Sequence, residues 1–273
     1  MTDVFASEQQ HSDKQADIRA AKEAIAGPVP LIADAPDSTC RLPRGLFQRG
    51  NWQKEAEVRE LVGTDEEALA KTSDQLSFFS SVIALGVTRI GEVDFTQVPL
   101  AERKFYLGEL LIGEREQLFM KVIQASFGDA KVIPFTCTEC DTEQEFTLIL
   151  SQDLKPKEVP DIEQSVVYTT KKGDVLDVRA ALGADQEETL GKKGASLAEQ
   201  NTILLSRCIT KRNGELIVNP LDYARGLGIK DRLALLDKLM ERQPSVSLDL
   251  KTTCVACSAE QNIALGWGDL FRP

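Results

Sequence analysis

Four of the six cysteines form two identical pairs, Cys137-Thr-Glu-Cys140 and Cys254-Val-Ala-Cys257. Thiolates at this spacing are typical ligands of structural zinc, which takes four of them in tetrahedral geometry. Each pair alone supplies two ligands and would leave the ion unsaturated. We therefore expect one structural zinc ion per chain, bound jointly by all four cysteines.

Reduced turn motifs and local redox pairs are the alternative interpretations of these cysteines. A redox pair of the thioredoxin type needs a strand–helix–strand context, which the flanking residues do not predict. Four thiolates also close the coordination shell, so a catalytic zinc with bound water is not expected. The single histidine, His11, excludes His-centred triads and zinc sites with several imidazoles. Cys208 lies in an apolar stretch and is expected to be a small buried side chain.

Both cysteine pairs belong to a longer phrase, Thr-Cys-x-x-Cys-x-x-Glu-Gln, and we call each such turn a knuckle. Val246, Leu248 and Leu250 alternate with polar residues before the second knuckle, as in a strand. Strand, knuckle and strand together make half of a zinc ribbon. The Glu143-Gln144 and Glu260-Gln261 pairs are expected just beyond the metal, where they help to form the turn and need no further role.

The composition is that of a soluble globular protein with room for two domains: 273 residues, 42% hydrophobic and 27% charged. The net charge of -11 argues against binding a nucleic-acid backbone and favours a partner whose contacting face is neutral or basic. The N-terminus has no apolar segment of a signal peptide, and no apolar run reaches membrane-spanning length. We therefore expect a cytoplasmic location, where thiols stay reduced, and no membrane contact.

The chain also contains a long internal repeat. Val58-Arg59-x-x-x-Gly63-x-Asp65-x-Glu67 returns 120 residues later, and further echoes follow in the same order at offsets of 115 to 123 residues. Collinear echoes indicate duplication. We assign residues 50–150 to the first repeat, 151–164 to a linker and 165–273 to the second repeat.

Residues 1–49 have no repeat partner and are expected to form an N-terminal arm, extended or disordered, or ordered only on a partner. The arm carries apolar residues between prolines and polar residues: Val29, Leu31, Ile32, Leu42, Leu46 and Phe47. They are too scattered for an independent core. We expect the arm to dock on a partner protein, with folding back onto its own body as the alternative.

Each repeat is expected to open with an extended segment such as Ser165–Thr169. A helix then follows, with a capping box formed by Thr64 and Glu67 in the first repeat and by Asp185 and Glu188 in the second. The acidic clusters at these positions could also be general acids or a cation site. The start of a helix explains them better, because carboxylates are favourable near the N-terminus of a helix.

A second helix is expected after Pro99 and after Pro220, because proline is permitted in the first turn. A third helix should carry an apolar stripe and end at Gly128 in the first repeat. The stripe comprises Leu118, Phe119, Val122 and Ile123 in the first repeat and Leu233, Leu236 and Met240 in the second. The predicted fold class is α+β. It is internally duplicated, with two helical-plus-strand halves related by a pseudo-two-fold and joined by a zinc-ribbon-like site of four cysteines.

Two halves that each end in Cys-x-x-Cys and a strand, with a terminal Asp269-Leu270-Phe271-Arg272, resemble proteins of contractile-tailed bacteriophages. The similarity is to the T-even-like baseplate hub and hub-assembly family and covers about residues 50–273. It implies a non-enzymatic protein that builds the tail hub or baseplate by protein–protein contacts. Such a protein would act in the host cytoplasm, as a virion component or as an assembly factor.

Two other classes remain open on the residues alone. One is a zinc-ribbon adaptor subunit of another large cytoplasmic complex. The other is an enzyme that uses carboxylates which the sequence does not identify. The binding classes predict a stable partner and no turnover, whereas the enzyme predicts a concave pocket with carboxylates of shifted pKa.

Overall fold

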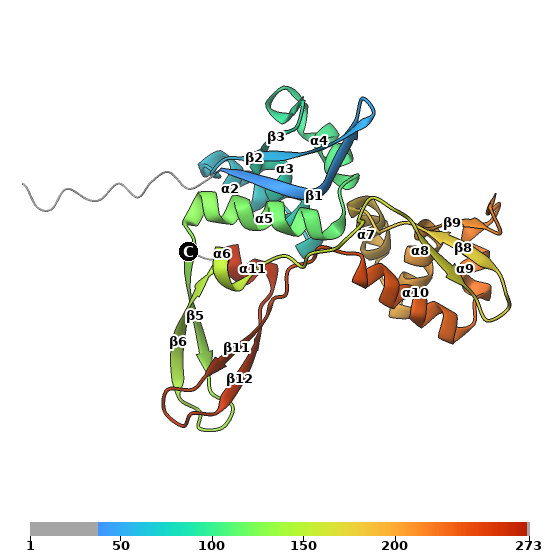
Figure 1. Ribbon diagram of the computed structural model, residues 1–273. Helices are drawn as coiled ribbons and strands as arrows, with labels where there is room; N and C mark the ends of the chain where they lie inside the picture. The colour runs from blue at the N-terminus through green and yellow to red at the C-terminus, as the bar shows by residue number, and fades with distance from the viewer. Residues whose placement is uncertain (1–37, 272–273) are drawn as a thin grey trace, which may run out of the picture. The chain divides into compact units, whose positions relative to one another are not determined.

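The structure is a computed structural model that describes residues 38–271, which belong to one compact unit (Figure 1). Helices and antiparallel sheets alternate along the chain, so the predicted α+β class is confirmed. Within the described residues no helix combines the length and the apolar character needed to cross a membrane.

The described chain is built from two successive sets of elements, residues 39–153 (the first half) and residues 166–271 (the second half). The first half contains β1 (Thr39–Gln48), β2 (Asn51–Val58), α2 (Gly63–Leu69), α3 (Gln75–Gly86), β3 (Val87–Ile90), β4 (Val93–Asp94), the 3-10 helix η1 (Phe95–Gln97), α4 (Leu100–Gly108), α5 (Ile112–Phe127), β5 (Ala130–Thr136), β6 (Glu143–Ile149) and α6 (Leu150–Asp153). The second half contains β7 (Val166–Thr169), β8 (Val175–Val178), α7 (Gly183–Gly191), α8 (Leu197–Cys208), β9 (Ile209–Arg212), β10 (Glu215–Leu216), α9 (Pro220–Gly226), α10 (Ile229–Glu241), β11 (Asp249–Thr253), β12 (Glu260–Ala264) and α11 (Trp267–Phe271).

Apart from η1, the two sets run in the same order. Each half contributes a four-stranded antiparallel sheet, ordered β1-β2-β3-β4 in the first half and β10-β9-β8-β7 in the second. The strand register shifts at the end of β2 against β3, and likewise at the end of β8 against β9. Each half then ends in a two-stranded hairpin, β5–β6 or β11–β12, that carries one knuckle.

Strand β1 shows that the last residues of the predicted N-terminal arm follow the alternative, folding back onto the body of the protein. It lies within residues 1–49, yet it pairs with β2, and its Leu42 and Leu46 are buried in the core. The pairing shifts between Arg41 and Leu46. At Gly45 the backbone has a φ of +75°, and a Cβ atom there would lie 1.9 Å from the Gln53 carbonyl oxygen. This irregularity interrupts the alternation by which a strand is recognised in a sequence. Of the other apolar residues of the arm, Phe47 is exposed on β1, and Val29, Leu31 and Ile32 lie outside the described residues.

The structure also contains two helices that the sequence analysis did not predict, α3 and α8. Both begin at a side-chain cap: Asp74 accepts a hydrogen bond from the Ser77 backbone N–H, and Ser196 accepts one from that of Glu199. Such caps are recognisable in a sequence, so both helices could have been found from it. The Cys208 thiol at the end of α8 is buried, as predicted.

The predicted helix starts at residues 64 and 185 are close, but the capping residues differ. The Asp65 carboxylate accepts the Val62 backbone N–H at 2.9 Å, and the Asp185 carboxylate accepts that of Leu182 at 2.8 Å. Thr64 and Glu67 therefore do not form the box. A carboxylate at the third helical position satisfies a backbone donor that the helix leaves unpaired.

The stripe predicted on the third helix is confirmed in the first half, whereas in the second half only Leu236 of the predicted residues packs against the core. In α5 the side chains of Leu118 and Val122 are fully buried. In α10 the buried leucines are Leu235 and Leu239, while Leu233 and Met240 are exposed.

A register error of two residues explains why Leu233 was expected in the core in place of Leu235. Glu114 is the third residue of α5 and Asp231 the third of α10, so the two helices correspond at an offset of 117 residues. The sequence echo between residues 113–118 and 228–233 aligns them at an offset of 115.

The two halves meet at a buried arginine of α5. The Arg115 guanidinium donates hydrogen bonds to Ser80 Oγ and to Glu187 Oε1, both at 2.7 Å. Gly183, at the start of α7, packs so tightly against it that a Cβ atom would lie 2.3 Å from Arg115 Cδ. The Gly183 backbone N–H also donates to the Leu110 carbonyl at 2.8 Å. The junction is therefore closely packed and polar at its centre.

The segment predicted as a linker, 151–164, packs on the protein. Leu154 and Ile162 are buried, and the Lys157 backbone N–H donates to the Ser245 carbonyl at 3.0 Å. The C-terminal segment lies on the first half's core: the Trp267 ring centroid is 5.5 Å from that of Phe79. The chain thus returns to its first core after completing the second.

Candidate metal centre

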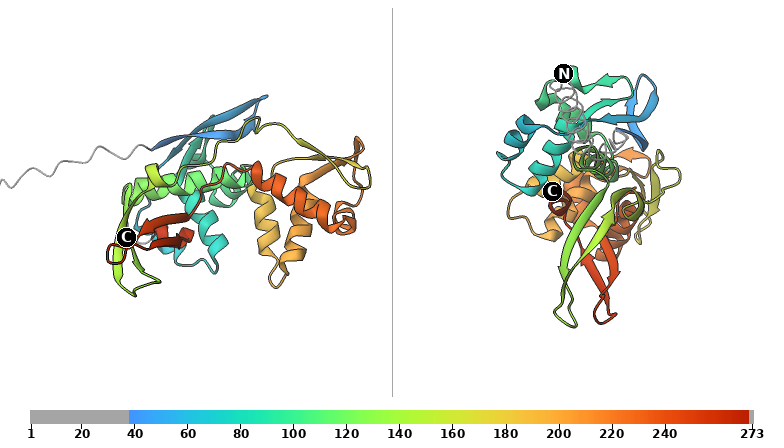
Figure 2. Two further views of the ribbon diagram at one scale, coloured as in Figure 1. Left: turned by 60° about the horizontal axis from the view of Figure 1, so that its bottom comes forward. Right: turned by 90° about the vertical axis from the view of Figure 1, so that its left-hand side faces the viewer.

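The two knuckles are held by the hairpins β5–β6 and β11–β12, which lie side by side (Figures 1 and 2). Each hairpin closes at the same place relative to its cysteines. Thr136 pairs with Glu143 in the first, and Thr253 pairs with Glu260 in the second. The six-residue turns 137–142 and 254–259 therefore project from equivalent strand ends.

The first knuckle is fixed by its own backbone. The Cys137 N–H donates to the Thr142 carbonyl at 3.0 Å, and the Asp141 N–H donates to the Cys137 carbonyl at 3.1 Å. Asp141 has a φ of 54°. This left-handed conformation, which aspartate tolerates better than most residues, turns the chain back into β6.

The second knuckle repeats this geometry. The Cys254 N–H donates to the Ala259 carbonyl at 2.9 Å, and the Ser258 N–H donates to the Cys254 carbonyl at 2.9 Å. Ser258 occupies the position of Asp141 and has a φ of 62°. The two turns therefore present their cysteines from the same backbone, although the residues between and after the cysteines differ.

The four sulfur atoms converge on one point. Cys137 Sγ lies 3.7 Å from Cys257 Sγ, Cys140 Sγ lies 3.6 Å from Cys254 Sγ, and all four atoms lie within 4.8 Å of one another. A disulfide would need a separation of about 2 Å, and all four thiols are free. Ligands about 2.3 Å from a tetrahedral ion lie about 3.8 Å apart, so these sulfurs could hold one metal ion.

Glutamine side chains link each hairpin to the opposite knuckle. Gln144 Nε2 donates to Cys254 Sγ at 3.1 Å, and Gln144 Oε1 accepts the Val255 backbone N–H at 3.0 Å. Gln261 Oε1 accepts the backbone N–H of Thr138, also at 3.0 Å. Both bonds reach the residue that follows the first cysteine of the other knuckle. The expectation that these glutamines only form their own turn was wrong, because their partners lie on the other hairpin.

The protonation of the thiols reflects their crowding. The pKa of Cys254 is lowered to about 6, chiefly by the hydrogen bond from Gln144. The pKa of Cys257 is raised to about 12, because hydrogen bonds with the sulfurs of Cys140 and Cys254 outweigh that from Ala259. Neighbouring thiolates repel one another, so they cannot all ionise at neutral pH without a cation. A divalent ion would supply the missing positive charge.

The other candidates from the sequence lie away from this centre. Burial raises the pKa of the Cys208 thiol to about 12, which makes it unreactive. Asp65 and Asp185 receive bidentate hydrogen bonds from Arg59 and Arg179, respectively, at 2.6 to 2.9 Å. These carboxylates serve helix starts, as expected. His11 lies outside the described residues.

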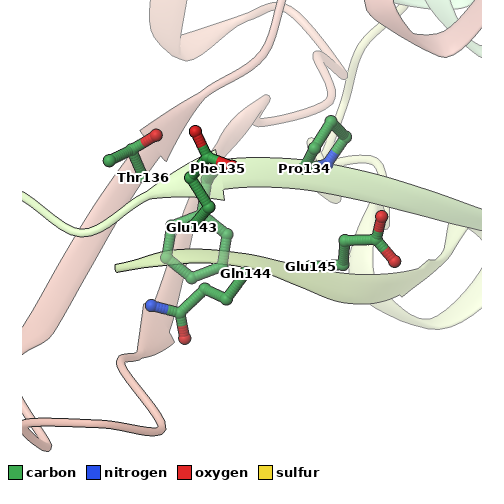
Figure 3. A pocket seen from close by; sticks show the side chains of 6 residues that line it. All are labelled: Pro134, Phe135, Thr136, Glu143, Gln144 and Glu145. Atoms are coloured by element: carbon green, nitrogen blue, oxygen red, sulfur yellow. The ribbon is translucent and has the colours of Figure 1, made fainter. Parts of the chain in front are cut away.

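An open hollow lies on the first hairpin. Pro134, Phe135 and Thr136 of β5 and Glu143, Gln144 and Glu145 of β6 line it (Figure 3). Gln144 points away from the strand on the side opposite to Glu143, toward the other knuckle. The lining contains carboxylates and no nucleophilic thiol, imidazole or amine, so the hollow does not identify a reaction.

One carboxylate with a shifted pKa does lie in a cavity. Burial raises the pKa of Glu116 to about 7, and its Oε2 accepts the Val246 backbone N–H at 3.1 Å. The cavity, about 180 Å³, is smaller than the roughly 300 Å³ at which ligand pockets begin. The hydrogen bond to the Val246 backbone therefore gives Glu116 a structural role.

Comparison with known proteins gives one match. A family model described as T4 bacteriophage base plate protein matches residues 95–272, well over half of the chain and including the whole candidate metal centre. Neither the curated proteins nor the solved structures gave a match. The chain belongs to the T4 bacteriophage base plate protein family.

Proposed function

We propose that this protein is a non-enzymatic structural or assembly protein of a phage tail baseplate hub, stabilised by one zinc ion and acting through protein–protein contacts. Membership of the base plate family supports the role in the tail. The convergence of the four cysteine sulfurs carries the metal part of the proposal. Assembly would take place in the host cytoplasm, and the protein would remain in the tail or leave it as an assembly factor.

Zinc is the metal that fits the four sulfurs best. Four thiolates in tetrahedral arrangement suit zinc or iron, and zinc needs no redox partner. The glutamine bonds to the opposite knuckle would hold the ligands in place before the ion binds, as outer hydrogen bonds do in other metal sites. Because four thiolates close the shell, the ion would be structural.

We also propose that the two halves arose by duplication, with the first repeat extending back to β1. The common order of elements and the matched knuckle backbones support this proposal. So do the arginine–aspartate pairs Arg59–Asp65 and Arg179–Asp185, which occupy the same place at the starts of α2 and α7. The two knuckles would then be related by a pseudo-two-fold axis through the ion.

The zinc ion would fasten distant parts of the chain. Cys140 and Cys254, whose sulfurs are 3.6 Å apart, are separated by 114 residues. Closing a loop of this length removes much conformational freedom from the unfolded chain. The proposed result is a rigid body on which partners of the tail can assemble.

Metal analysis of protein purified without chelators tests the proposal. We expect zinc near one per chain. Iron with visible absorption, or no metal at all, would contradict it.

Cys254→Ser and Cys208→Ser form a matched pair of variants. The first should lose the metal and much of its stability, since structural zinc sites contribute on the order of 10 kcal/mol of apparent binding energy. The second places a hydroxyl in a buried position, should cost about 1 to 3 kcal/mol and should keep the metal. Equal losses of stability in thermal unfolding, with metal retained in both, would show that Cys254 is no ligand.

A further inference from the structure

Helix α10 carries a second apolar face, which points to solvent. Its core face consists of Leu235 and Leu239, whereas Ile229, Leu233 and Met240 are 77%, 56% and 65% exposed. A helix at the surface of a domain ordinarily has one apolar stripe and a polar opposite face. The second stripe therefore calls for a partner.

The spacing of this second stripe is that of a coiled-coil seam. Ile229, Leu233, the half-buried Leu236 and Met240 are separated by four, three and four residues. Apolar residues at this spacing lie in one line and interlock with the same pattern on another helix. The stripe thus matches the surface of a second helix better than that of a sheet or an irregular chain.

The corresponding face of α5 is covered by the protein itself. Phe119 and Ile123 occupy the positions of Leu236 and Met240 at the offset of 117 residues, and both are fully buried. The Trp267 ring centroid lies 5.4 Å from that of Phe119. The C-terminal segment therefore covers this part of α5, whereas Met240 of α10 is left 65% exposed by the residues that the structure describes.

The charges beside the stripe indicate which helix fits. Lys230 and Asp237 each follow a seam residue, two turns apart on the same flank. On the other flank, Arg232 is already engaged, because it donates to the Ala224 carbonyl at 2.8 Å and to Thr202 Oγ1 at 2.8 Å. The charges of Lys230 and Asp237 are self-complementary when two copies of α10 run antiparallel, since same-flank positions then face each other.

We propose that α10 pairs with α10 of a second copy of this chain, antiparallel and about a two-fold axis. Ile229 then faces Met240 of the second copy, and Leu233 faces its Leu236. Lys230 lies beside Asp237 of the second copy, twice by symmetry. The exposed Leu197 at the start of α8 precedes Ala198, whose carbonyl accepts a hydrogen bond from Arg232 of α10 at 3.1 Å. The proposal is independent of the metal centre.

The seam is short, so the dimer should be concentration-dependent. One helix pair buries less than the roughly 1,600 Å² of a standard interface. Sedimentation equilibrium of the full chain should show a mass that rises from 30.1 kDa toward twice that value over a range of about 1 to 200 µM. A mass that stays at that of one chain throughout would overturn the proposal, even if a tail protein binds to the same face.

Substitution of the seam gives the second test. Leu233→Glu should abolish the dimer without lowering the thermal midpoint of the monomer, because the side chain is exposed. Val167→Glu is the matched control: it is an exposed apolar residue of the same half, on β7. Side chains alternate along a strand, so Val167 points to the face opposite to Tyr168, the β7 residue that bonds to Asp231 of α10. If the Leu233→Glu variant still dimerises, or if both variants lose the dimer, pairing through the α10 stripe is contradicted.

A charge exchange tests the direction of the helices. Lys230→Asp and Asp237→Lys should each weaken the dimer roughly 3- to 10-fold, because each places like charges side by side. The double variant should restore the dimer, since the pairs form again with their signs exchanged. A double variant weaker than either single variant would rule out the antiparallel pairing.

Discussion

Gln144 and Gln261 each reach from one hairpin to the backbone of the opposite knuckle. Each satisfies the N–H that follows the first cysteine, and Gln144 also donates to the Cys254 sulfur. Such bonds position a ligand and favour its ionised form, so their contribution should be measured as metal affinity more than as catalytic rate.

We expect Gln144→Ala to weaken metal binding about 10- to 100-fold, in line with other outer hydrogen bonds of metal sites. Competition with a chromogenic chelator measures this affinity. Glu145→Ala, an exposed neighbour on the same strand, is the control and should bind as the wild type does. Equal affinities of the two variants would show that the bond to Cys254 is not needed.

Glu116 is the residue from which a pH dependence of stability is expected. Its pKa is raised by burial from 4.5 to about 7 in the folded protein. Between these values the folded state binds a proton that the unfolded state has lost. The contribution of Glu116 to stability therefore falls as the pH rises from about 4.5 to 7 and is constant above that range.

The Glu116→Gln variant should lose this pH dependence. At pH 8 it should be more stable than the wild type by about 1 to 2 kcal/mol, since the neutral amide oxygen can still accept the Val246 N–H. Urea unfolding at pH 5 and pH 8 measures the difference. The exposed Glu67→Gln change should have no such effect. If the variant keeps the pH profile of the wild type, ionisation of Glu116 does not lower the free energy of unfolding.

Among the elements, α10 differs from α5 in what covers it. The two helices share the acidic third residue and the core leucine that follows it by four positions. Their backbones thus enter the two cores in the same way. Their second apolar faces differ, because the C-terminal segment packs on α5.

Leucine truncation separates the two faces of α10. Leu235→Ala should cost about 2 to 5 kcal/mol, because it removes a fully buried side chain and leaves a cavity. Leu233→Ala should change the stability by less than about 0.5 kcal/mol when measured on dilute protein. Chemical unfolding of both variants checks this. A larger loss for Leu233→Ala would place the core face where the sequence pattern had predicted it.

At the scale of the whole molecule, the first strand determines how much of the N-terminus can be removed. The Arg44 and Gly45 backbone N–H groups donate to the buried Glu114 carboxylate, so β1 supplies both apolar cover and hydrogen bonds. Removing the strand would leave that carboxylate buried without these partners, which is costly.

Deletion of residues 1–37 should leave a folded protein that keeps its metal, because every described element remains. Deletion of residues 1–49 should prevent folding, because it also removes Leu42 and Leu46 from the core. Circular dichroism and metal content of the two truncated proteins distinguish these outcomes. A folded protein after the longer deletion would show that β1 is dispensable. If the shorter deletion loses only assembly with tail proteins, the arm is the docking segment.

Local patterns in the sequence predicted the features that depend on residues close together in the chain. The Cys-x-x-Cys spacing determines the knuckles, because four adjacent residues fix where both thiols point. The apolar period predicted the buried face of α5, and Gly128 predicted its end, where it adopts a φ of 84°. The caps of α3 and α8 were equally local.

The tertiary structure alone decided which of these pieces meet. The sequence did not show that β1 completes a sheet, that each glutamine bonds the opposite knuckle, or that Leu235 and not Leu233 enters the core. The glutamine bonds join residues more than a hundred positions apart. Strand β1 pairs with the adjacent β2, but its backbone also bonds to Glu114 of α5, 70 positions from Arg44. Contacts between distant segments produce no periodic pattern of apolar residues in the local sequence. Helix α10, for example, has two apolar stripes, and only the packing of α8, α9 and the second sheet against one of them makes that stripe the core face.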